Sequence, residues 1–168
     1  DPELLRSLQE ELERRVGGVV GGIEEAVKFL QSLPSIRRGE LLKLVREKDP
    51  AAAASLRERV LLMEDIVLLD RADLTTLIGE TPLEDLAAAA GGLPETFAAA
   101  IVEVLPRQTS TLYKEMVQLG GAALIERGPE ARERLLRRAE VLISEGRIRR
   151  PAVHGSRIGI RSEEHTSE

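Results

Sequence analysis

The sequence contains no cysteine and no tryptophan, and aromatic residues make up only 2% of its 168 residues. The absence of cysteine excludes disulfides, a thiol nucleophile and cysteine-ligated zinc. With so few large rings, the core has to be built from leucine, alanine, isoleucine and valine, which favours the packing of helix on helix. The only histidines, His154 and His165, lie close to the C-terminus. The rest of the chain therefore offers no histidine for a catalytic triad, a general base or a metal site.

Basic charge and long apolar runs are also lacking. The net charge of −5 argues against nucleic acid as a partner, because nucleic-acid binding requires a basic surface. No apolar run approaches the about 20 residues of a membrane-spanning helix, so direct membrane insertion is not expected. The 32% of charged and 42% of hydrophobic residues are typical of a globular protein in water. Because the first residue is Asp1 and not methionine, we expect a piece of a longer protein.

Groups that could carry out catalysis are few. The carboxylate pairs Glu64–Asp65 and Glu84–Asp85 stand where helices are expected to begin, and there acidic side chains favour the positive end of the helix dipole. The glycines of GGVVGG are followed by no Lys-Ser or Lys-Thr and no strand precedes them, so they do not form a phosphate-binding loop. We therefore expect no enzyme, no catalytic residue, no cofactor and no metal. The remaining class is a protein that works by contact with other proteins.

What the sequence does contain is helical periodicity. Apolar residues recur every three to four positions along most of the chain, and no alternating strand pattern appears before the tail. Asp49-Pro50 and Thr81-Pro82 predict helix starts, with proline at the first helical position, and Thr81 with Glu84 predicts a capping box. Further prolines fall between apolar stripes: Pro34, Pro94, Pro106 and Pro129. Helix ends are predicted at Gly91–Gly92, Gly120–Gly121 and Gly146, because glycine tolerates the left-handed conformation found there. The prediction is an all-α fold of about nine or ten short helices, packed as an orthogonal bundle or as stacked armadillo-like repeats.

Two segments are predicted to be joints. The first is the glycine-rich stretch VGGVVGG, which we interpret as a hinge in preference to a surface loop, because a charged helix precedes it and a complete apolar pattern follows. Glycine is a poor residue for a helix interior. The second is the apolar run VLLM, which is followed by acidic residues suited to a helix start. The predicted hinge residues are Gly17, Gly18, Gly21, Gly22, Val60, Leu61, Leu62 and Met63.

The C-terminal tail is irregular in pattern. Residues 149–168 show no helical period, and the last segment, RSEEHTSE at 161–168, resembles the translation of a common sequencing adapter. We expect residues 161–168 to be an artefact of assembly and leave them out of the fold prediction.

The segment EDIVLLDRADLTTLI, followed by TPLEDLAAAAGG, resembles the C-terminal region of FliG, the rotor protein family of the bacterial flagellar motor switch. In that family a Met-Phe-Val-Phe motif precedes Glu-Asp-Ile/Leu-Val and an acidic turn. Here Val60–Met63 stands in the place of the motif, and Glu64–Asp70 follows it closely. The resemblance extends over residues 1–148 and implies armadillo-like stacked helices followed by a compact C-terminal helical domain.

The resemblance also implies a division of the chain. Residues 1–16 would be the end of the middle armadillo segment, and 17–22 the glycine-rich hinge. Residues 23–69 would be the C-terminal armadillo helices with the apolar joint at 60–63, and 70–148 the torque-type domain. In the family, armadillo faces of neighbouring subunits stack. The residues that we expect to stack are Leu41, Leu42, Leu44 and Val45.

The function implied by the resemblance is that of a rotor and switch component. Its partners would be a FliM-type switch protein, the cytoplasmic loop of a MotA-type stator, and neighbouring FliG subunits in a ring. It would lie at the cytoplasmic face of the inner membrane, peripheral to it, at the flagellar basal body. Torque would come from contact with the stator, and direction from rearrangement at the hinges.

The helix expected to face the stator, RQTSTLYKEMVQL, departs from the family. Most of the family's charged positions are not matched, although Glu115 is in register and Arg107 adjoins another. The candidates for facing the stator are Arg107, Lys114 and Glu115. Because a single exposed charge pair is worth only about 0–1 kcal/mol, the missing charges leave an alternative open. This is a FliG-like armadillo scaffold that is not engaged in torque generation.

Overall fold

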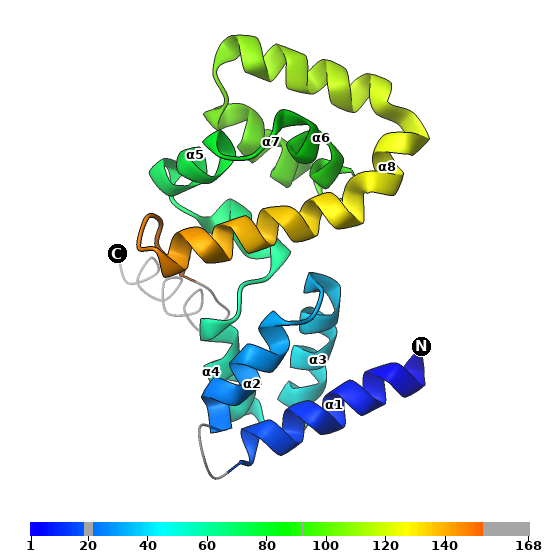
Figure 1. Ribbon diagram of the computed structural model, residues 1–168, viewed down its shortest axis with the longest axis vertical. Helices are drawn as coiled ribbons and strands as arrows, with labels where there is room; N and C mark the ends of the chain where they lie inside the picture. Colours follow the sequence, from blue (N-terminus) through cyan, green and yellow to red (C-terminus); the bar gives the residue numbers. More distant parts are fainter. Residues whose placement is uncertain (19–21, 92, 153–168) are drawn as a thin grey trace, which may run out of the picture. The chain divides into compact units, whose positions relative to one another are not determined.

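A computed structural model describes residues 1–18, 22–91 and 93–152 (Figure 1). These residues form helices and connecting turns and contain no strand, which confirms the predicted all-α fold. The chain divides into two compact units, Asp1–Leu62 and Met63–Pro151. The division falls inside the predicted joint at 60–63, and all four side chains of that joint are buried.

The first unit contains helices α1 (Pro2–Val16), α2 (Gly22–Gln31), α3 (Ser35–Lys48) and α4 (Pro50–Arg59). As predicted, α4 begins with Pro50 in its first turn, and the Asp49 carboxylate caps it by accepting a hydrogen bond from the Ala52 N–H at 3.1 Å. The helices bury a common core of aliphatic side chains. Its members with at most 1% exposure are Leu12, Ala26, Leu30, Leu41, Leu56 and Val60.

One arginine lies inside this first unit. Arg38 belongs to the same stripe of α3 as Leu41, Leu42 and Val45, and it is only 1% exposed. Its guanidinium donates from Nη2 to the Gln31 carbonyl at 2.8 Å and from Nε to the Leu33 carbonyl at 2.9 Å. Gln31 is the last residue of α2 and Leu33 follows it, and the last carbonyls of a helix have no partner within the helix. Arg38 therefore caps α2 from a different helix.

The second unit contains a 3₁₀ helix, η1 (Met63–Leu68), and helices α5 (Arg71–Gly79), α6 (Leu83–Ala90), α7 (Glu95–Val104) and α8 (Arg107–Ser144). The acidic pairs Glu64–Asp65 and Glu84–Asp85 stand in the first turns of η1 and α6, as predicted. Four consecutive alanines of α6 are buried. Their small side chains let α8 pack closely against α6.

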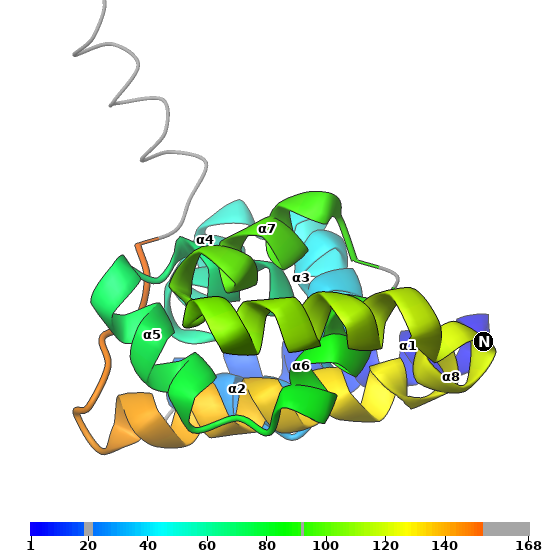
Figure 2. The same ribbon diagram turned by 90° about the horizontal axis from the view of Figure 1, so that it is seen from above.

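Helix α8 turns back on itself at Gly121, whose φ of 58° and ψ of −148° are not helical. Glycine reaches this conformation at no steric cost, unlike residues with a side chain. The two halves of α8 run in opposite directions with α6 and α7 between them (Figures 1 and 2). The predicted end of a helix at Gly120–Gly121 is thus a sharp kink between two helical segments.

The segment after α8 is fixed to α5. Gly146, with φ of 75°, ends the helix as predicted. Arg147 pairs with Glu80, and the Arg149 backbone N–H donates to Asp73 at 2.9 Å. The Arg149 guanidinium also donates to Asp70, the N-cap residue of α5, at 2.9 Å. Residues 153–168 of the predicted tail, with His154 and His165, lie outside the described residues.

Two local predictions are wrong. Thr81 does not cap α6: the helix begins at Leu83 after Pro82, and the Thr81 hydroxyl donates to the Leu77 carbonyl at 2.7 Å, closing the end of α5 instead. Pro129 does not separate helices but lies inside α8. There the packing of α8 against α6 outweighs the loss of about 3 kcal/mol that proline causes in a helix interior. The other three prolines of that group do precede helices α3, α7 and α8.

Candidate functional site

The N-terminal half of α8 presents an exposed face. Arg107, Lys114 and Glu115, the residues expected to face the stator, are all exposed. Arg107 and Lys114 are seven residues apart and lie on the same side of the helix, whereas Glu115 points about 100° away from Lys114. The three side chains thus form a broad charged surface and not one compact cluster.

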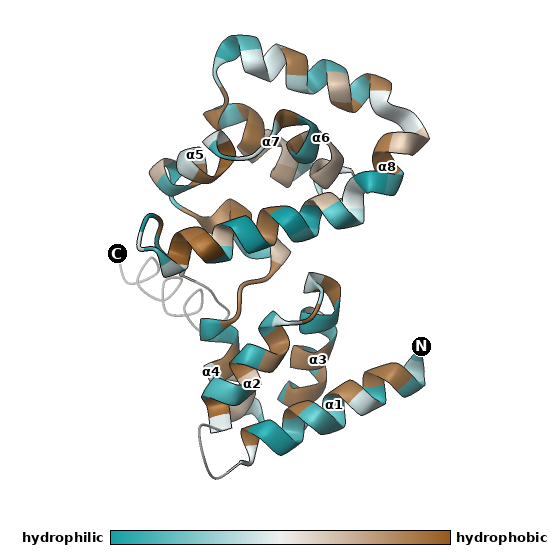
Figure 3. Cartoon of the chain, viewed as in Figure 1, coloured by the Kyte–Doolittle hydropathy of each residue, from teal (hydrophilic) through white to brown (hydrophobic). Residues whose placement is uncertain are grey.

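Large apolar side chains lie on the same half-helix, on the side that carries Glu115 and roughly 150° around the helix from Lys114. Leu112 is 50% exposed and Leu119 is 81% exposed, and the alternation of hydrophobic and hydrophilic residues along this half of α8 is visible in Figure 3. Ile125, which follows the kink, is 65% exposed. The surface is therefore mixed, with two cations, one anion and two leucines between Arg107 and Leu119.

The opposite side of this half-helix is anchored by Ser110 and Tyr113, which are buried. The Tyr113 hydroxyl has no hydrogen-bond partner among the described residues, and burial raises the pKa of Tyr113 to about 12. The tyrosine thus serves as an apolar anchor, and its hydroxyl is a destabilising group in this position.

The C-terminal half of α8 carries the close packing against α6. A Cβ atom on Gly128 would lie 3.1 Å from the Ala88 carbonyl oxygen, so a side chain here would push the two helices apart by a few tenths of an ångström. One turn later, Arg132 donates from Nη1 to the Gly91 carbonyl at 2.6 Å, at the C-terminal cap of α6. Arg132 therefore caps the C-terminal end of α6 from another helix, as Arg38 caps the end of α2 in the first unit.

A bidentate ion pair adds to this contact. Arg134 donates from Nη2 to Oδ1 of Asp85 at 2.9 Å and from Nε to Oδ2 at 3.1 Å. The hydrogen bond from Arg134 is the main cause that lowers the pKa of Asp85, and the charges of Arg138 and Arg127 lower it further. Together with Gly128 and Arg132, this pair orients the long helix whose other half carries the exposed face.

Residues 43–149 match the family described as the FliG C-terminal domain. The chain belongs to this family. Curated flagellar motor switch proteins FliG are similar to it: that of Thermotoga maritima is 23% identical over 142 residues, covering 80% of this chain and 42% of the relative. The FliG of Borreliella burgdorferi is 20% identical over 88% of this chain and 45% of the relative. The chain spans less than half the length of these relatives.

Solved FliG structures share the fold. A crystal structure of H. pylori FliG has a TM-score of 0.58 at 19% identity and covers 89% of this chain and 70% of that chain. A second H. pylori FliG crystal structure has a TM-score of 0.52 at 19% identity, covering 83% of this chain and 64% of that one. These matches support the armadillo-like and compact helical architecture of the FliG family.

The residues predicted to act as hinges are placed as follows. Gly17 ends α1 and Gly22 begins α2, while Gly21 lies outside the described residues. A Cβ on Gly18 would lie 3.2 Å from the Arg15 carbonyl oxygen, and one on Gly22 would lie 2.9 Å from that of Val16. Side chains at Gly18 and Gly22 would thus crowd the carbonyl groups at the end of α1. Glycine is therefore favoured at both positions, whether or not the segment acts as a hinge.

The predicted stacking residues of the FliG armadillo face have different exposures. Leu41, Leu42 and Val45 are buried in the core of the first unit, whereas Leu44 is half-buried and packs against it. A neighbouring subunit could contact the side chain of Leu44 directly. The buried side chains of Leu41, Leu42 and Val45 could contribute to stacking only by holding the surface residues of the first unit in place. Ile36, on the same helix, is 71% exposed and was not predicted.

Sequence reasoning missed the arginines that organise the fold. Arg38 and Arg138 both occur at positions of an apolar stripe, Arg38 ahead of Leu41 and Arg138 between Leu135 and Leu142. A charged residue on such a stripe is a signal that a periodicity search could have found.

In the part of the chain that the structure describes, no group of residues is arranged to hold a metal ion, and no helix there combines the length and apolarity needed to span a bilayer.

Proposed function

We propose that this chain is the C-terminal part of a rotor and switch component of a bacterial flagellar motor. The exposed face of the N-terminal half of α8 would receive force from the cytoplasmic loop of a MotA-type stator. Its role is mechanical contact and not catalysis. Membership of the FliG C-terminal domain family supports this proposal, and the single observation that carries it is the exposure of Arg107, Lys114 and Glu115 on one half-helix.

The rest of the unit suits a force-bearing role. The exposed half of α8 is continuous through Gly121 with the half that packs against α6. The Arg134–Asp85 pair and the Arg132 cap stiffen that contact. A push on the exposed face would therefore be passed to the body of the second unit and not absorbed by a loose helix.

Direction switching would use the two joints. The glycine connection between α1 and α2 and the apolar segment Val60–Met63 would change conformation when a FliM-type switch protein signals. Neighbouring FliG subunits would stack through surfaces of the first unit that include Leu44. We place such an assembly at the cytoplasmic face of the inner membrane, as a ring at the flagellar basal body.

Charge reversal in the cell of origin tests the proposal. Lys114→Glu and Glu115→Lys, introduced singly into the gene, should leave filaments in place but slow the rotation of tethered cells about two- to fivefold, the scale of an exposed charge contact. Glu103→Lys, an exposed site in the last turn of α7, is the matched control and should rotate normally. Normal rotation in both α8 variants, and in the combined reversal with Arg107→Glu, would overturn the proposal.

A further inference from the structure

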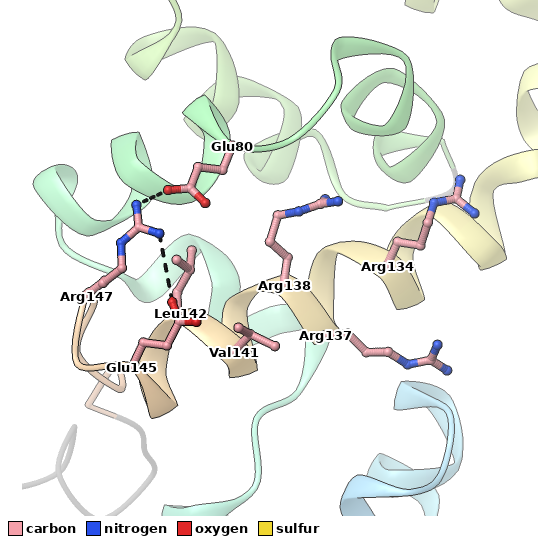
Figure 4. Close-up of a pocket in the computed structure, with 8 residues that line it drawn as sticks. All are labelled: Glu80, Arg134, Arg137, Arg138, Val141, Leu142, Glu145 and Arg147. Atoms are coloured by element: carbon pink, nitrogen blue, oxygen red, sulfur yellow. Dashed lines mark hydrogen bonds and ion pairs between the residues drawn. The ribbon is translucent and has the colours of Figure 1, made fainter.

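A second surface lies in the second unit, away from the exposed face of α8. The C-terminal half of α8, the end of α5 and Arg147 enclose an open pocket of about 400 Å³. Arg134, Arg137 and Arg138 line this pocket together with Glu80 and Arg147. Figure 4 shows Arg134 and Arg138 projecting from one side of α8 and Arg137 from the other, with Glu80 and Arg147 at the far end. Four guanidinium groups therefore line one small hollow.

The carboxylates near the pocket do not balance these cations. Glu80 and Glu145 both pair with Arg147, and Asp85 is held by Arg134. Arg137 and Arg138 add two further positive charges to the pocket, in a chain whose net charge is −5. The charge of the pocket is therefore opposite to that of the chain as a whole.

Arg138 shows that the site lacks an acceptor. Its Nη1 is buried and has no hydrogen-bond partner among the described residues. The buried Arg38, by contrast, donates to three carbonyls. Because buried guanidinium N–H groups are normally paired, Arg138 would gain from an acceptor brought by another molecule if its guanidinium turned toward the pocket.

The pocket also has an apolar part. Val141 is 52% exposed beside the arginines, and Leu142 is buried beneath it. A guanidinium binds a carboxylate through two parallel hydrogen bonds, and the pocket volume lies in the range of ligand sites. Its openness fits a side chain presented on a protein surface better than an enclosed small molecule.

We propose that this pocket is a docking site for an acidic segment of a partner protein, in which separate acidic side chains reach Arg137 and Arg138 and a neighbouring apolar residue covers Val141. This assignment goes beyond the proposed function, because it concerns a different surface and holds whether or not the exposed face of α8 receives torque. The occupant is defined by its chemistry: carboxylates next to an aliphatic side chain.

An NMR titration of the full chain tests the docking site. The probe is a blocked heptapeptide of alternating leucine and glutamate, compared with the same peptide carrying glutamine for glutamate and with inorganic phosphate. The glutamate peptide should shift the Nε–H signals of Arg137 and Arg138 and the methyl signals of Val141 until saturation. Arg137→Gln and Arg138→Gln should each weaken its binding about tenfold, while Arg46→Gln, which removes the same charge from an exposed site of α3, should leave it unchanged.

Several outcomes would overturn the proposal. These are a response without saturation, equal binding of the glutamine peptide, and an equal loss in Arg46→Gln, which would indicate bulk charge alone. Tighter binding of phosphate than of the glutamate peptide would make the pocket a small-anion site. If Arg138→Gln does not fold, the exposed Arg137→Gln decides the question by itself.

Discussion

The Arg38 guanidinium donates from Nη1 to the carbonyl oxygen of Leu61 at 2.9 Å, across 23 positions of the sequence. Leu61 belongs to the apolar joint Val60–Met63, and the same guanidinium caps the end of α2. One buried side chain therefore fastens the joint to the core of the first unit. The conformation of the joint depends on a residue that is distant in sequence.

Replacing Arg38 should destabilise the chain strongly. Arg38→Met retains much of the aliphatic volume but removes the donor from the buried Leu61 carbonyl and from the partly buried carbonyls of Gln31 and Leu33. A buried carbonyl without its donor costs about 1–3 kcal/mol. We expect a loss of about 3 kcal/mol in the free energy of unfolding, measured by urea denaturation. Arg37→Met is the control, because the neighbouring Arg37 pairs with Glu40 on its own helix. Equal stability of the two variants would show that the Arg38 hydrogen bonds contribute nothing.

The Asp85–Arg134 pair predicts a pH dependence. The pKa of Asp85 is lowered in the folded chain, so the pair stabilises the fold above the unfolded pKa of about 4, and this contribution is lost as the pH falls through the folded-state pKa. Asp85→Asn should therefore lower the free energy of unfolding at pH 7, and with it the Tm. We expect a loss of only about 1 kcal/mol, because Arg134 is partly exposed to solvent. In strong acid its Tm should equal that of the unmodified chain. Glu84→Gln, at the exposed neighbouring carboxylate, should show no such pH-dependent difference.

Gly128 should resist any side chain. In Gly128→Ala the new Cβ would lie 3.1 Å from the Ala88 carbonyl oxygen and 2.8 Å from Arg132 Nη1. We expect a net destabilisation of about 1 kcal/mol, since overpacking outweighs the better helix propensity of alanine. Gly79→Ala, in α5 with nothing within 4 Å of the new atom, should keep or raise the Tm. The two changes are chemically identical, so equal Tm shifts in differential scanning calorimetry would contradict the close packing of α6 and α8.

Tyr113 offers a substitution that should stabilise the chain. Its hydroxyl is buried and has no partner in the part of the chain that the structure describes, and Tyr113→Phe removes that group while keeping the ring. Removing an unsatisfied buried polar group should raise the free energy of unfolding by about 1 kcal/mol. The gain is measurable by urea denaturation at neutral pH, where the tyrosine is neutral because burial raises its pKa to about 12. A clear loss of stability would mean that the hydroxyl has a partner in solution, such as a bound water.

Local signals in the sequence predicted the fold well where the structure is decided locally. The Asp49-Pro50 start of α4 and the glycine end of α8 depend on residues adjacent in the chain, and both predictions are confirmed. The Thr81 cap failed because two local interactions competed: the hydroxyl could bond forward to α6 or back to Leu77, and it bonds back. Such i to i−4 bonds of threonine are common enough to compete with caps.

The interactions made across helices could not be predicted in this way. Arg132 reaches carbonyls of α6 about 40 positions earlier in the chain, and nothing in its own neighbourhood indicates that partner. The resemblance to the FliG family located the exposed half of α8, and Arg107, Lys114 and Glu115 are indeed exposed. Their role in torque stays a prediction. Periodicity missed the exposure of Leu119, because leucine at helical spacing is read as part of a core.

The exposed leucines of α8 lead to the last prediction, which concerns how force reaches the rotor. Most charges of the family's torque helix are absent here, while Leu112 and Leu119 are exposed on the side of the helix that also carries Glu115. If these leucines contact the stator, Leu119→Gln should reduce the stall torque of tethered cells more than Gln118→Ala, a neighbouring exposed position. The chain itself should keep its Tm, since Leu119 is 81% exposed and buries little area.

The salt dependence separates the two kinds of contact. A contact made by Lys114 and Glu115 is screened as ionic strength rises, whereas an apolar contact is not. With the leucine contact dominant, rotation of the unmodified motor should be insensitive to salt, and Leu119→Gln should make the remaining torque salt-dependent. Unchanged torque in Leu119→Gln, together with strong salt dependence in the unmodified motor, would instead assign the contact to the few charges that remain.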